Sequence, residues 1–327
     1  MNLAIDYYPF LNFYHAGPKV FLNRLKNSLK KQNLCSVRSP YTPFFDIALF
    51  SVYEKNFFNK KFILRVDGIY FDKNNTAGDT NNLNNKIFNS ISKANGVIYI
   101  SKFSKDMVNK FYGNLNIPEK IIHNKVPLNY FKPNGDNYRN DLNIKNNERV
   151  LITSAHWRRH KRLEETIYFT NYLNSYSPIK YKLIILGGNK KKFNDENIIS
   201  IGEVKPNLLS KWYRTADIYL HLAWIEPCGN TQIEAMASGI PVVCCNNGGI
   251  GETVIKAKGG IVVETDDQYE MNLIDYYNPP KPNYQNLKNA VEKIYDDYQD
   301  YKNKIDYDYL NIDLAAKEYF EFIKKCL

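Results

Sequence analysis

The sequence lacks the features of membrane-spanning, disulfide-rich and zinc-binding proteins. No apolar stretch approaches the roughly 18 residues that a membrane-spanning helix needs, and no cleavable signal precedes the first apolar segment. The five cysteines form no CxxC pair, and the adjacent Cys244 and Cys245 lie in an apolar segment, which argues for reduced, buried thiols. The five histidines form no HExxH motif. We therefore expect a soluble cytoplasmic protein with at most peripheral membrane contact.

The composition indicates two packed domains with a basic surface. A length of 327 residues exceeds the usual size of one domain, and 44% hydrophobic residues are enough for packed cores. The net charge of +10 would suit nucleic acid or an anionic membrane. However, Lys, Asn, Ile and Tyr are abundant together, as an A/T-rich genome produces, and no RNA-binding pattern of interleaved aromatic and basic residues is present. We therefore expect no nucleic-acid partner.

Short apolar runs alternate with helical patterns along the first half of the chain, which predicts a parallel sheet. The expected strands are residues 3–5, 46–52, 62–66, 97–101 and 120–123, and the expected helices are residues 18–31, 83–94 and 102–112. The polar, Asn-rich residues 134–148 indicate a linker. We therefore place a first domain at residues 1–140, a second at 141–305 and a final helical segment at 306–327.

One stretch, IEPCGNTQIEAMASGIPVV, organises the second half. Its loop leads into a helix that ends at Gly239, and two carboxylates, Glu226 and Glu234, bracket the start of that helix with seven residues between them. The free backbone N–H groups at the start of the helix predict an anion site suited to a diphosphate. Both carboxylates are expected to face the same cleft.

A second stretch, HWRRHKR from His156 to Arg162, places positive charge at a strand-to-helix turn. Cations at a helix N-terminus oppose the helix dipole, so their presence needs a reason. Fixed cations would stabilise the charge of a departing diphosphate. The stretch therefore indicates a phosphate-binding turn.

The E-x7-E pattern followed by AMASGIPVV resembles the signature of retaining glycosyltransferases with two Rossmann-like domains (the GT-B fold), in particular family 4. The resemblance spans nearly the whole chain and is strongest between residues 152 and 263. It implies an α/β fold in which two Rossmann-like domains face each other across a cleft and the last helix crosses back onto the first domain. The first domain would hold the acceptor, and the second the nucleotide-sugar.

The resemblance also implies roles for individual residues of the second domain. Glu226 would hold the hydroxyls of the donor sugar, and Glu234 the ribose. Arg158 and Lys161 would grip the donor phosphates, although the usual spacing is longer, so that Arg159 is an alternative to Arg158. Gly17, which lies in a glycine-bearing loop together with His15, is also expected to contact the donor. The remaining residues expected to contact the donor are Gly187, Val204, Cys228, Gly229, Asn230 and Thr231.

Asp67 is the candidate on the acceptor side. It follows an apolar strand, at the sheet edge where open α/β sheets bind ligands, and could orient or deprotonate an acceptor hydroxyl. Many family members carry His-Asp or His-Gly at this place, so the sequence departs from the family here. A structural role for Asp67, as a capping residue in a tight turn before Gly68, is an equal alternative to the catalytic role. We therefore predict three catalytic residues: Asp67, Lys161 and Glu226.

The predicted reaction moves a sugar from a UDP- or GDP-sugar to an acceptor hydroxyl with retention of configuration. No cofactor and no metal are expected, because Arg158, Lys161 and the helix dipole would supply the positive charge, and Asp266–Asp267 fits a turn better than a metal site. The acceptor class stays open between glycan, lipid, protein and small molecule. Two alternatives compete: a non-catalytic basic protein that binds glycan or nucleic acid, and a sugar-nucleotide epimerase of related fold. A phosphorylase would need a longer chain and a pyridoxal lysine.

Overall fold

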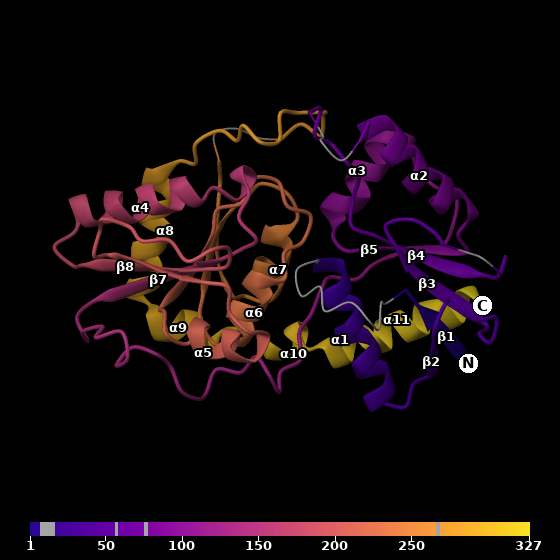
Figure 1. Cartoon of the computed structure of the whole chain (residues 1–327), viewed down its shortest axis with the longest axis horizontal. Helices are drawn as coiled ribbons and strands as arrows, with labels where there is room; N and C mark the ends of the chain where they lie inside the picture. Colours follow the sequence, from indigo (N-terminus) through magenta and orange to yellow (C-terminus); the bar gives the residue numbers. More distant parts are fainter. Residues whose placement is uncertain (7–16, 56–57, 75–77, 266–268) are drawn as a thin grey trace.

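The computed structural model describes residues 1–6, 17–55, 58–74, 78–265 and 269–327. Within these residues the chain forms two α/β domains, each built on a six-stranded parallel sheet. The two domains lie side by side in Figure 1, with the first in indigo and purple and the second in magenta to orange. The predicted fold class is confirmed.

The first sheet has the strand order β2-β1-β3-β4-β5-β6. Its elements are β1 (Asn2–Ile5), α1 (Gly17–Lys31), β2 (Ser36–Arg38), β3 (Ile47–Ser51), β4 (Phe62–Val66), α2 (Thr80–Lys93), β5 (Gly96–Tyr99), α3 (Lys102–Tyr112) and β6 (Glu119–Ile121). The central strands β3, β4 and β5 are buried almost throughout, as expected for a parallel sheet covered on both faces. Side chains of Asp79 and Ser101 cap α2 and α3.

The second sheet has the strand order β12-β11-β10-β7-β8-β9. Its strands are β7 (Arg149–Ser154), β8 (Tyr181–Leu186), β9 (Ile198–Gly202), β10 (Ile218–His221), β11 (Val242–Cys245) and β12 (Gly260–Val263). The connections contain η1 (Arg159–Lys161), α4 (Leu163–Tyr176), η2 (Pro206–Leu208), α5 (Leu209–Tyr213), α6 (Thr231–Ala237) and α7 (Ile250–Lys256). A 3-10 turn begins at Pro206 and leads directly into α5.

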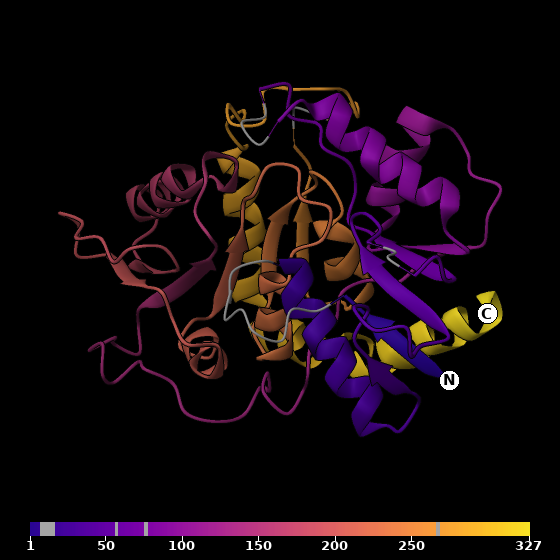
Figure 2. The same cartoon turned by 45° about the vertical axis from the view of Figure 1, so that its right-hand side comes forward.

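The chain ends with α8 (Tyr284–Asp296), α9 (Tyr298–Asn303), α10 (Tyr307–Leu310) and α11 (Ile312–Cys326). The last helix lies on the first domain, below its sheet in Figures 1 and 2. It packs against α1, where Tyr319 contacts Phe21 at a ring-centroid distance of 5.8 Å and Asp313 accepts a 2.6 Å hydrogen bond from Ser28. Within the described part of the chain, every helix is too short or too polar to cross a bilayer.

The carboxyl ends of strands from both sheets meet at the boundary between the domains. Gly68, after β4, lies against Pro227, and a side chain added at Gly68 would be 3.5 Å from the Pro227 ring. Gly249, after β11, lies so close to Ser101 and to the Pro227 carbonyl oxygen that a side chain would clash with both. Because ligands of open α/β sheets bind at the carboxyl ends of strands, this boundary is the expected place for a site.

Candidate active site

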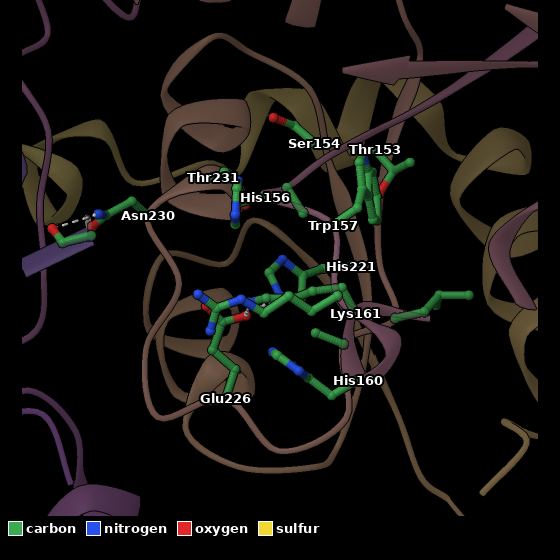
Figure 3. A pocket seen from close by; sticks show the side chains of 15 residues that line it. Thr153, Ser154, His156, Trp157, His160, Lys161, His221, Glu226, Asn230 and Thr231 are labelled. Atoms are coloured by element: carbon green, nitrogen blue, oxygen red, sulfur yellow. Dashed lines mark hydrogen bonds and ion pairs between the residues drawn. The ribbon is translucent and has the colours of Figure 1, made fainter. Parts of the chain in front are cut away.

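A pocket of about 420 Å³ lies at the carboxyl end of the second sheet, with Gly17 of the first domain on one side. Its walls come from the end of β7, the stretch from His156 to Arg162 (the basic turn), the end of β10 and the start of α6. They consist of Gly17, Thr153, Ser154, Ala155, His156, Trp157, Arg158, His160, Lys161, His221, Leu222, Ala223, Glu226, Asn230 and Thr231. Figure 3 shows the side chains of Lys161, His221 and Glu226 converging in it.

Lys161, His221 and Glu226 form a charged cluster in this pocket. The Glu226 Oε2 atom lies 2.6 Å from Lys161 Nζ and 3.0 Å from His221 Nε2. Burial alone would raise the pKa of Glu226, but the charge of Lys161 and the hydrogen bond from His221 outweigh it and hold that pKa well below its usual range. The carboxylate is therefore ionised at neutral pH and can accept hydrogen bonds but not donate a proton.

The arginines of the basic turn have different surroundings. Arg158 lines the pocket, whereas Arg159 pairs with Glu165 at 2.6 Å. Arg162 has a left-handed backbone with φ 55°, and its buried side chain donates to the carbonyl oxygens of Leu222 and Pro280. Of the two arginines considered for phosphate binding, Arg158 is thus the one at the pocket.

A chain of hydrogen bonds crosses from the first domain to the pocket. The fully buried Arg65 bonds to Asp67 and donates to Asn124 Oδ1 at 2.8 Å. Asn124 donates to Asn230 Oδ1 at 3.0 Å, and Asn230 in turn donates to the Gly17 carbonyl oxygen at 3.2 Å. Asp67, the acceptor-side candidate, is thereby linked to the loop that precedes α6.

The family model described as glycosyl transferases group 1 matches residues 134–309, just over half of the chain. This chain belongs to that family. Curated relatives include an uncharacterized glycosyltransferase of Methanocaldococcus jannaschii, 25% identical over 51% of this chain and 46% of its own length. The alpha-monoglucosyldiacylglycerol synthase of Streptococcus pneumoniae is 22% identical over 46% of this chain and 37% of its own length. The matches thus cover less than half the length of these relatives.

Solved glycosyltransferase structures share the fold over the whole chain. The Anabaena protein HepE in complex with UDP superposes with a TM-score of 0.68 and 14% identity, covering 99% of both chains. Sucrose-phosphate synthase from Thermosynechococcus elongatus has a TM-score of 0.68 and 15% identity, with 99% of this chain and 96% of that chain covered. At 14–15% identity these comparisons show a shared fold and not a shared substrate.

Half of the residues proposed from the glycosyltransferase resemblance line the pocket. These are Gly17, Arg158, Lys161, Glu226, Asn230 and Thr231. The others are not among the lining residues: Asp67, Gly187, Val204, Cys228, Gly229 and Glu234. Gly187, for example, supports a wall, because a side chain there would meet the Ala155 carbonyl oxygen at 2.1 Å. The roles of all these residues stay predictions, and His15, Asp266 and Asp267 lie outside the described residues.

The sequence predicted that Glu226 and Glu234 face the same cleft. In the structure Glu234 is not among the residues that line the pocket. It is buried, and its Oε1 atom accepts a 2.6 Å hydrogen bond from Arg24 Nη2 of the first domain. Its Oε2 atom accepts from the Tyr213 hydroxyl at 3.1 Å. The two carboxylates of E-x7-E therefore face different partners in this structure, because Glu234 lies on the side of α6 that meets α1 and α5.

His221 and His160 are pocket residues that sequence reasoning missed. His221, the last residue of β10, was counted only among the five histidines, and His160 was named only as part of the HWRRHKR stretch, without a role of its own. The position of His221 at the carboxyl end of a strand was the available signal. The described residues contain no group of three His, Cys, Asp or Glu side chains that could hold a metal ion, and metal independence stays a prediction.

Proposed function

We propose that this protein moves a sugar from a nucleoside-diphosphate sugar to an acceptor hydroxyl with retention of anomeric configuration. The observation that carries the proposal is the cluster of Lys161, His221 and Glu226 in a pocket that Arg158 also lines. A pocket with two cations and one ionised carboxylate suits a ligand with a diphosphate at one end and hydroxyl groups at the other.

In the proposed reaction Lys161 and Arg158 stabilise the diphosphate as it leaves. Negative charge develops on the phosphate oxygen when its bond to the anomeric carbon breaks, and preorganised cations lower the barrier to that step. Glu226 stays ionised and accepts hydrogen bonds from the hydroxyls of the donor sugar. Lys161 therefore has two tasks, since it also holds Glu226 at 2.6 Å.

The acceptor approaches from the first domain, where Asp67 is the proposed orienting residue. Arg65 bonds to Asp67, and the neighbouring Gly68 packs on Pro227, which follows Glu226. Burial raises the pKa of Asp67 although Arg65 opposes the shift. In the proposed reaction Asp67 orients the acceptor by accepting a hydrogen bond from its hydroxyl. In a front-face substitution the acceptor oxygen bonds to the anomeric carbon on the side from which the phosphate leaves, and the hydroxyl proton passes to the departing phosphate oxygen.

The names of related proteins support the choice of substrates. HepE of Anabaena was solved with UDP and with UDP-glucose, which favours a UDP-sugar as donor over a GDP-sugar. The Streptococcus pneumoniae relative is an alpha-monoglucosyldiacylglycerol synthase, which favours a lipid or a glycan as acceptor. With a lipid acceptor, the protein would work in the cytoplasm and touch the membrane peripherally.

The test is a turnover assay in the presence of EDTA with UDP-glucose or GDP-mannose and a panel of lipid and glycan acceptors. The proposal predicts release of nucleoside diphosphate that depends on the acceptor, and NMR of the product showing the anomeric configuration of the donor. An inverted product would refute the retaining mechanism. Free epimerised nucleotide-sugar without acceptor product would instead indicate the epimerase.

A further inference from the structure

Tyr276 contacts the residue directly before each partner of the Lys161–Glu226 ion pair. Its hydroxyl donates a 3.0 Å hydrogen bond to the carbonyl oxygen of Ile225, which precedes Glu226. Its ring stacks on His160, which precedes Lys161, with 4.1 Å between ring centroids and 20° between ring planes. One partly buried side chain thus contacts the residues that precede both members of the ion pair.

The backbone at Ile225 needs such support. Ile225 is fully buried and has φ 54°, a left-handed conformation that β-branched residues rarely adopt. This bend turns the chain after β10 so that Glu226 points back at Lys161 and His221. The hydrogen bond from Tyr276 satisfies the Ile225 carbonyl oxygen only while the chain keeps this bend.

The backbone of the basic turn is hydrogen-bonded to the segment that precedes Ile225. The Trp224 N–H donates to the His160 carbonyl oxygen at 2.7 Å, so the segment before Glu226 and the segment before Lys161 are tied directly to each other. Tyr276 packs over this junction, with its ring 6.5 Å from that of Trp224. A shift of Tyr276 would therefore disturb the spacing of both charged residues.

Tyr276 belongs to a segment that reaches the first domain, residues 269–280, which we call the strap. In Figures 1 and 2 it is the orange-to-yellow chain that runs across the top from the second domain to the first. Ile274 pairs with the backbone of Phe71 and Lys73 through hydrogen bonds of 2.9 Å each. The Phe71 ring also meets the Tyr276 ring edge-on at 4.7 Å. The residue behind the ion pair is thus itself held by the first domain.

We propose that Tyr276 is a positioning residue that keeps Glu226 and Lys161 in the reactive arrangement as long as the strap is docked on the first domain. The inference rests on the proposed function and deepens it. It explains why an aromatic residue with a hydroxyl stands here: the ring holds the basic turn and the hydroxyl holds the bend at Ile225. The contact between the domains is then a condition for correct geometry at the donor site.

The kinetic test compares Tyr276→Phe, which removes only the hydroxyl, with Tyr276→Leu, which removes the hydroxyl and the stacked ring. We expect kcat to fall about tenfold for Tyr276→Phe and about 10²-fold for Tyr276→Leu, with the donor KM changed less than about threefold. Tyr277→Phe is the matched control, because Tyr277 is 42% exposed and meets His160 only edge-on at 5.5 Å. Melting temperatures show that each variant is folded.

A double-mutant cycle separates positioning from general stabilisation. If Tyr276 acts through Glu226, Tyr276→Phe has no further effect on kcat in a Glu226→Gln background, whereas independent effects would multiply. Wild-type kcat for Tyr276→Phe, in an enzyme that turns over, would overturn the positioning role and leave the proposed function standing.

A crystal structure of Tyr276→Leu gives an outcome that does not depend on activity. The inference predicts that Ile225 leaves the left-handed region or that Glu226 separates from Lys161. An unchanged Ile225 with an intact ion pair would overturn the inference, even if no nucleotide-sugar were ever turned over. Absence of turnover in the wild type would instead count against the proposed function.

Discussion

Arg24 of the first domain and Glu234 of the second form an ion pair at 2.6 Å, between residues that are 210 positions apart in the chain. The side chains are only 14% and 5% exposed, so the pair is largely shielded from water. The Arg24 guanidinium also lies 5.2 Å from the centre of the Phe131 ring. The second carboxylate of the E-x7-E pattern is therefore part of the contact between the domains.

Arg24→Gln should destabilise the protein, because Glu234 would stay buried with Tyr213 as its hydrogen-bond partner. We expect a loss of about 1–3 kcal/mol and a melting temperature lower by about 2–6 °C. Lys31→Gln on the same helix is the control, since Lys31 is 73% exposed and its pair with Asp313 should contribute less than about 1 kcal/mol. Equal melting temperatures of the two variants would show that the buried ion pair contributes no more to the free energy of unfolding than the exposed one.

Glu234→Ala should act on donor binding more than on the chemical step. If the ribose binds Glu234, the donor KM rises about tenfold while kcat changes little, because that contact is equally strong in the ground state and the transition state. Initial rates at varied donor concentration measure the two constants separately. A fall in kcat at constant KM would place Glu234 in the chemical step instead.

Lys161→Ala and Glu226→Ala should each lower kcat/KM about 10²-fold or more. Each change removes a group proposed to contact the donor and leaves its ion-pair partner without a counter-charge. The measurement is kcat/KM for the donor, with circular dichroism as the check on folding. Wild-type turnover by either folded variant would contradict the assignment.

Arg158→Ala and Arg159→Ala should differ although the residues are adjacent. Arg158 lines the pocket, so its loss should reduce kcat/KM by about 10²-fold, whereas Arg159 is occupied by Glu165 and its loss should cost less than about threefold. The two variants carry the same change in charge, which makes each the control for the other. The reverse order of effects would assign the phosphate to Arg159.

Stability should decrease as the pH falls below about 6.5, partly because of His160. Burial, reinforced by the charge of Lys161, lowers the pKa of His160 to about 3. The unfolded chain binds a proton at this histidine near pH 6.5 and the folded chain does not, so the stability from neutral His160 is present above pH 6.5 and lost towards pH 3. His160→Phe, which keeps an aromatic ring on Tyr276, should flatten the slope of melting temperature between pH 7 and pH 4.5. An unchanged slope would show that His160 is protonated in the folded protein.

Local sequence patterns predicted parallel α/β sheets and a phosphate-binding turn, and the resemblance to glycosyltransferases supplied the arrangement of two Rossmann-like domains. The expected strand at residues 62–66 and helix at residues 102–112 match β4 and α3 residue for residue, because apolar periodicity and the Ser101 cap are local signals. Strand β2 was missed, since its sequence Ser36–Arg38 is short and polar at an edge of the sheet.

Contacts between the domains could not be predicted from one sequence. The ion pair of Arg24 with Glu234 and the hydrogen bond of Tyr276 with Ile225 depend on how the two domains meet. No spacing in the chain encodes that arrangement. The conformation of the strap likewise depends on contacts with Phe71, Asp72 and His160, which lie far from it in the sequence.

The most direct test of the central claim is ligand-induced thermal stabilisation of the wild type and of Lys161→Ala, without metal, across UDP-, GDP- and ADP-sugars. Ligand that binds the folded state alone at 100 times its Kd stabilises it by about 2.7 kcal/mol. We predict a clear rise in melting temperature with UDP-sugars and a much smaller rise in Lys161→Ala. No rise with any nucleotide-sugar, in a folded wild type, would contradict the claim that this pocket binds the donor.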